Sequence, residues 1–151
     1  MGELLSGTTG FFFTNLAFVS ALLSAVSLLF SLRENDAQTG WRNLGKYAFF
    51  VHAFSVTGII ATLFSLIYTH QYQYHYVWSH SSNELPVYYM ISCFWEGQEG
   101  SFLLWMFWHS ILGCIAWKTA GKWKYGVTAI VATVETILVT MVLGVHFPVW
   151  V

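Results

Sequence analysis

Residues 11–32 read FFFTNLAFVSALLSAVSLLFSL, a stretch without a single charged side chain. As an α-helix that rises ~1.5 Å per residue, this stretch would extend roughly 33 Å, enough to cross the hydrocarbon core of a bilayer. The residues before it, which begin Met-Gly-Glu, lack the basic segment of a cleavable signal peptide. The stretch therefore predicts a retained transmembrane helix.

Three further stretches suggest membrane spans. Residues 47–69 contain His52 as their only titratable group besides tyrosine, and residues 125–146 are interrupted in the middle by Glu135. Residues 101–117 are at the lower limit of spanning length, so a re-entrant segment is the alternative there. Hydrophobic residues make up 56% of the chain and charged residues 9%, against roughly 25% charged in a soluble domain. The sequence predicts an all-α integral membrane protein with four transmembrane helices.

The distribution of positive charge predicts the orientation of these helices. All six basic residues fall in the first and third connections between spans: Arg33, Arg42, Lys46, Lys118, Lys122 and Lys124. Because cytoplasmic loops concentrate Lys and Arg, we expect both connections inside the cell and both termini outside. Residues 70–100 then form one long, aromatic-rich external loop.

The distribution of Lys and Arg also indicates the sidedness of the chain in the membrane. We expect residues 1–151 to form a single membrane domain with the external loop on the periplasmic side or its equivalent. The lipid bilayer is one expected partner. Nucleic acid is not, because the sequence has no basic stripe.

The external loop is rich in tyrosine, tryptophan and histidine. Aromatic residues at 72, 74, 76 and 78 alternate as they would on one face of a strand. An interfacial aromatic belt and a flat platform for a planar ligand both fit this pattern. Three histidines follow one another at intervals of five: His70, His75 and His80. Successive members would turn by about 140° on a helix, and the middle one would face away on a strand, which argues against a shared metal site.

Two motifs in and after this loop resemble a known family. Residues 76–89 read YVWSHSSNELPVYY, and residues 95–105 read WEGQEGSFLLW. In order and spacing they resemble the N-terminal region of the cytochrome c maturation haem lyase subunit CcmF, of the CcmF/CcsA haem-handling family. That family carries YVASxSNxxLPxxYR followed by WGGxEGSLLLW. The departures are Met90 for a frequent Arg, Glu96 for a Gly, and Gln98 where His is frequent.

The resemblance implies a component of cytochrome c maturation that supports haem handling and haem attachment to apocytochrome c on the external face. Haem, apocytochrome c and other maturation subunits are then the expected partners. The family's tryptophan-rich motif and haem-ligating histidines lie further along a longer chain. We therefore expect a fragment or split subunit that is not catalytic alone, with the iron ligands outside it. The haem-proximal candidates are Trp78, Trp95, Gln98, Glu99 and Trp105.

The start of the third span has a capping pattern. Ser101 is a candidate N-cap, and Glu99 would lie near the positive end of the helix dipole. A buried cap without any chemistry fits the same residues. The two cysteines, Cys93 and Cys114, form neither a C-x-x-C pattern nor a covalent haem site, and we expect no metal centre.

Three ionisable residues fall inside the spans, where a polar group is costly and usually faces protein or water. His109 and Glu135 lie near mid-membrane, so we expect a hydrogen-bonded pair whose members lie within about 8 Å, the reach of a direct or water-bridged contact. His52 is expected near the inner end of its helix. A satisfied core pair, a proton relay and an intramembrane site of a small transporter subunit all remain open for His109 and Glu135. A scaffolding subunit of a membrane complex is the other alternative function.

Overall fold

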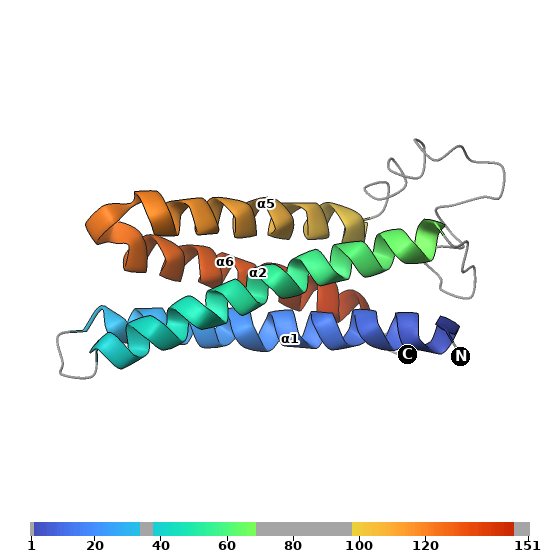
Figure 1. The fold of residues 1–151 in the computed structure, drawn as a ribbon, viewed down its shortest axis with the longest axis horizontal. Coiled ribbons are helices and arrows are strands. Elements are labelled where there is room, and N and C mark those ends of the chain that lie inside the picture. Colours follow the sequence, from blue (N-terminus) through green and yellow to red (C-terminus); the bar gives the residue numbers. More distant parts are fainter. Residues whose placement is uncertain (1, 34–37, 69–97, 147–151) are drawn as a thin grey trace.

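The computed structural model describes residues 2–33, 38–68 and 98–146, and these form four long helices (Figure 1). The helices are α1 (Gly2–Ser31), α2 (Gln38–Tyr68), α5 (Gln98–Thr119) and α6 (Lys124–His146), with a short 3₁₀ helix η1 (Gly121–Trp123) before α6. All four are long and apolar enough to cross a membrane. The prediction of four membrane-spanning helices is confirmed to that extent.

Helices α1, α2 and α5 begin before the apolar stretches that predicted their spans, and the predicted N-cap at Ser101 is wrong. α2 begins at Gln38 rather than at residue 47. The cations of Arg42 and Lys46 end the apolar run but not the helix, because a long basic side chain can reach back along apolar surface to the membrane interface. α5 begins at Gln98 and is one continuous helix, so Ser101 lies within the helix and is not its N-cap.

The four helices pack as a ring. α1 packs against α2 and α6, while α5 packs against α6 and, over a smaller area, against α2. The guanidinium carbon of Arg42 lies 4.6 Å from the centre of the Tyr125 ring. This contact brings the start of α2 beside the start of α6, so the basic residues of both connections lie at one end of the bundle (Figure 1). We call it the basic end. The predicted external loop lies outside the described residues, apart from its last three positions, which open α5.

Small residues bring α1 close to α2. The hydroxyl of Ser24 donates a hydrogen bond to the Gly45 carbonyl at 2.9 Å. A Cβ at Gly45 would lie 2.5 Å from Leu28 Cγ, so only glycine allows this approach. Small residues generally allow the backbones of membrane helices to approach closely. The small side chains buried along α1 are Ala17, Ser20, Ala21, Ser24, Ala25, Ser27 and Ser31.

The core has two apolar clusters with a polar layer between them. The larger cluster lies towards the end of the bundle opposite the basic end and consists of Ala17, Val56, Ile59, Leu66, Leu103, Met106, Leu138, Val139 and Val142. The smaller lies towards the basic end and consists of Ala25, Phe49 and Ala132. His52 lies one turn beyond Phe49, and Glu135 one turn beyond Ala132, so both fall between the clusters.

The orientation can be tested with two single cysteines in a background in which Cys93 and Cys114 are replaced by serine. A cysteine at Asn83 should react with a membrane-impermeant thiol reagent in intact cells, because no Lys or Arg lies in its segment. The matched control, Trp123→Cys, is at an exposed position of the basic end and should react only after lysis. The reverse pattern would overturn the predicted orientation.

Candidate functional site

A buried pair of ionisable side chains crosses the centre of the bundle. His52 of α2 and Glu135 of α6 have no exposed surface, and Nε2 of the histidine lies 3.1 Å from Oε2 of the carboxyl group. The other ring nitrogen, Nδ1, lies 3.0 Å from the carbonyl oxygen of Ala17 on α1. The pair therefore joins three helices, and it spans the ring of helices diagonally.

The carbonyl of Ala17 fixes the protonation of the imidazole. A carbonyl oxygen only accepts hydrogen bonds, so Nδ1 of His52 must carry a proton and donate it. The contact between Nε2 and Oε2 needs a proton of its own, which sits either on the imidazole or on the carboxyl group. In both states the pair is neutral overall. It thus avoids the cost of an uncompensated charge in a medium of low dielectric constant.

His109 of α5 is the third member of this site. Its Nδ1 lies 3.8 Å from Oε1 of Glu135, beyond hydrogen-bond distance. Both atoms are buried, and neither has a hydrogen-bond partner among the residues that the structure describes. The side chain of His109 is nevertheless 41% exposed, so the ring has one buried edge and one open edge.

The predicted proximity of His109 and Glu135 is confirmed, since Nδ1 and Oε1 are 3.8 Å apart. The predicted hydrogen bond between them is wrong, because this distance exceeds hydrogen-bond range. The expected depth of His52 is wrong. Because α2 begins at Gln38, His52 lies in the middle of the helix and supplies the hydrogen bond to Glu135. Sequence reasoning missed this contact because it measured depth from the apolar run. The sequence signal that could have found it is that a helix can continue through Arg42 and Lys46. Counting the helix from that point moves His52 away from its inner end.

The haem-proximal candidates are only partly described. Trp78 and Trp95 lie outside the described residues. Gln98 and Glu99 form the first turn of α5, at the end of that helix away from the basic end. Trp105 is 58% exposed, so its ring lies on the outer surface of the bundle. Trp105 is the one candidate whose side chain the structure describes.

The described residues offer an aromatic surface but no matched pair of axial ligands for haem. Both ring nitrogens of His52 are engaged, and His109 turns Nδ1 to Glu135. Within residues 2–33, 38–68 and 98–146, no three His, Cys, Asp or Glu side chains are placed to hold a metal ion. The described histidines are therefore not arranged as a pair of iron ligands.

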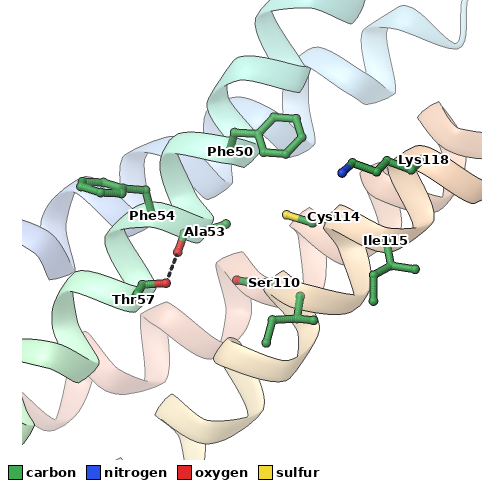
Figure 2. Close-up of a pocket in the computed structure, with 9 residues that line it drawn as sticks. Phe50, Ala53, Phe54, Thr57, Ser110, Cys114, Ile115 and Lys118 are labelled. Atoms are coloured by element: carbon green, nitrogen blue, oxygen red, sulfur yellow. Dashed lines mark hydrogen bonds between the residues drawn. The ribbon is translucent and has the colours of Figure 1, made fainter.

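An open groove of about 470 Å³ lies between α2 and α5. Figure 2 shows Ser110 and Cys114 pointing into it, with Lys118 towards the basic end. Thr57 lines the opposite wall, where its hydroxyl donates to the Ala53 carbonyl at 3.0 Å. The remaining lining is mainly Phe50, Phe54, Ile111 and Ile115. Such a groove suits an apolar chain, and it lies where α2 and α5 make their smaller contact.

Comparison of the chain with models of protein families, with curated proteins and with solved structures gives no match. The function must therefore be argued from the residues themselves.

The hydrogen bond between His52 and Glu135 should make the effects of replacing them on the unfolding free energy non-additive. Replacing one partner leaves the other without its hydrogen bond in the core, so His52→Leu or Glu135→Leu should each cost about 3 kcal/mol of unfolding free energy. The double replacement should cost less than the sum of the two, by roughly 1–3 kcal/mol. Reversible unfolding in lipid bicelles measures all three values.

Ser55→Ala is the matched control for this cycle. Ser55 is also buried on α2, but its hydroxyl donates only within the helix, to the Val51 carbonyl. Its replacement should cost less than about 1 kcal/mol. Strictly additive costs for the two members of the pair would contradict the coupling.

Proposed function

We propose that the chain is an integral membrane component of cytochrome c maturation, supporting haem handling and its attachment to apocytochrome c. The observation that carries the proposal is the motif at residues 95–105, WEGQEGSFLLW, which resembles the corresponding stretch of CcmF. The motif runs into α5, as it does into a membrane helix in that family. The tyrosine-rich motif at residues 76–89 precedes it at the family's spacing.

The proposal assigns the motif to the external face of a bacterial inner membrane or its organellar equivalent. All six basic residues belong to the opposite end of the bundle, and the positive-inside rule puts that end in the cytoplasm. The first turn of α5, with Gln98 and Glu99, then lies at the external end of its helix. Apocytochrome c and other maturation subunits would meet the chain on this side.

Within that function the chain would present and brace haem rather than ligate its iron. The exposed ring of Trp105 is large and flat, and aromatic faces stack on planar ring systems. The ligating histidines would come from a neighbouring subunit or from more of the same polypeptide. The His52–Glu135 pair would hold α1, α2 and α6 together beneath this surface.

A scaffolding subunit of a membrane complex is the alternative function that requires the fewest specific residues. It needs only the four helices and the buried pair. A small transporter subunit is the other alternative, and it would use His109 and Glu135 as its intramembrane site. Oε2 of Glu135 already contacts His52. The transporter site would therefore use Oε1, which has no hydrogen-bond partner among the described residues.

Variants in the motif can separate haem handling from scaffolding. Trp95→Ala and Glu99→Ala should each lower the yield of holo-cytochrome c severalfold while the chain still inserts in the membrane at its normal level. Single replacement of His70, His75 or His80 by alanine is the matched control in the same segment and should have much less effect. Holo-cytochrome c is measured by haem staining, and insertion by immunoblot of membranes.

Two outcomes would overturn parts of this account. If no motif variant changes holo-cytochrome c at normal protein level, scaffolding becomes the better account. If one of the three histidines is essential and its loss bleaches the haem spectrum of the purified complex, the segment ligates iron and the stacking surface is the wrong description.

A further inference from the structure

We infer that Glu135, His52 and His109 form an intramembrane proton-binding site, and that the proton enters through the open edge of His109. The inference is independent of the proposed function, because it rests only on the core of the bundle. Its basis is the arrangement of three side chains from α2, α5 and α6 around one carboxyl group.

The two oxygens of Glu135 have different surroundings. Oε2 shares a proton with Nε2 of His52, and this proton is held in a sealed contact, since neither side chain has any exposed surface. Oε1 is buried, has no hydrogen-bond partner among the described residues, and faces Nδ1 of His109 at 3.8 Å. An unsatisfied carboxyl oxygen in this setting costs free energy, which an incoming proton or a donated hydrogen bond would recover.

The imidazole of His109 connects this oxygen to the outside of the bundle. Its Nδ1 is buried against Glu135, while 41% of the side chain is exposed. An ionisable residue at this depth normally faces water or a protein partner rather than lipid. If Nε2 lies on the exposed side and Nδ1 on the buried side, the imidazole can accept a proton at Nε2 and release one from Nδ1.

The transfer balances in protons and charge. It starts with Glu135 ionised, with the shared proton on Nε2 of His52, and with His109 neutral and protonated on Nδ1. Nε2 accepts a proton from the open side, and the Nδ1 proton moves to Oε1 of Glu135. His109 ends neutral with its proton on Nε2, and Glu135 is protonated on Oε1. The proton shared between Glu135 and His52 stays in place, so the charge of the site rises by one.

No other described titratable side chain is placed to take this proton. α1 presents the Ala17 carbonyl, which accepts from His52 and from the hydroxyl of Ser20. α2 presents His52 and α5 presents His109. The nearest basic residue on α6 is Lys124, eleven residues from Glu135, or about 16 Å along the helix axis at 1.5 Å per residue.

Infrared spectroscopy of the purified chain in lipid bilayers tests the site. The pH range is about 4 to about 9, which brackets the ordinary titration of carboxyl and imidazole groups. The chain has seven Asp and Glu residues, so the contribution of Glu135 is taken as the difference between the unaltered protein and Glu135→Gln. In this difference spectrum, the C=O stretching band of a protonated carboxyl group should grow as the pH falls. After transfer to D₂O, the rate at which this band shifts reports exchange of the proton.

The role of His109 is tested by comparing exchange rates. His109→Leu should slow the exchange by roughly tenfold or more, because a positioned imidazole speeds proton transfer. Trp108→Phe is the matched control, since it changes an exposed ring at the neighbouring position of α5, and it should leave the rate unchanged. The double variant Ser27→Ala/Thr128→Val tests a route from the basic end, where both hydroxyls are buried and have no described hydrogen-bond partner.

A measurement on the unaltered protein guards against a variant that fails to fold. In ¹⁵N spectra of the histidine rings, the signals of His109 should change over the same pH interval as the carboxyl band. Nδ1 of His52 should remain protonated throughout. The inference is overturned if the difference spectrum between the unaltered protein and Glu135→Gln contains no carboxyl band at any pH. It is equally overturned by His109 signals that stay constant while the band grows, or by exchange that slows only in the Ser27/Thr128 variant.

Discussion

The constraint on which the rest of the bundle depends is a carboxyl group with no exposed surface in the middle of an apolar membrane protein. Oε2 of Glu135 is paired with Nε2 of His52, and His52 is in turn held by the Ala17 carbonyl. Each contact restricts the next, because the carbonyl fixes which ring nitrogen faces the carboxyl group. Lipid-facing helices gain little from burying apolar side chains against one another, so polar contacts of this kind help to specify which faces meet. The depth of α2 relative to α1 and α6 follows from this contact.

The polar layer also separates two halves of different character. The half opposite the basic end is filled by large apolar side chains such as Leu103, Met106 and Leu138. The half towards the basic end contains many small residues of α1, together with Leu28 and the ring of Phe49. A Cβ at Gly113 would approach that ring to 2.3 Å. Buried serines along α1 bond mainly to backbone carbonyls, as Ser24 does to Gly45 and Ser31 to Leu28. Among the four long helices, α5 has the smallest buried share. Its side chains of Trp105 and His109 are both partly exposed.

The sequence predicted the number and nature of the helices because apolar length alone decides them in a membrane. It predicted that His109 lies close to Glu135, because matched depth and the cost of an isolated ionisable group both favour it, but it was wrong to expect a hydrogen bond between them. It failed at His52, because helix boundaries follow backbone hydrogen bonding rather than hydropathy, and α2 continues through Arg42 and Lys46. It failed at Ser101 for the same reason at the start of α5. Rotation about the helix axis, which decides that Oε2 meets His52 and Oε1 meets His109, depends on packing and could not be predicted from spacing.

The haem-handling proposal and the proton-binding site rest on different parts of the chain, and both need the four helices in the register set by the buried pair. Dipolar-coupling solid-state NMR in lipid bilayers tests that register most directly, with ¹⁵N in the ring of His52 and ¹³C in the carboxyl group of Glu135. The account predicts a strong coupling between Nε2 and the carboxyl carbon, as required by an Nε2 to Oε2 distance of 3.1 Å. A protein with fully formed helices but no such coupling would contradict it.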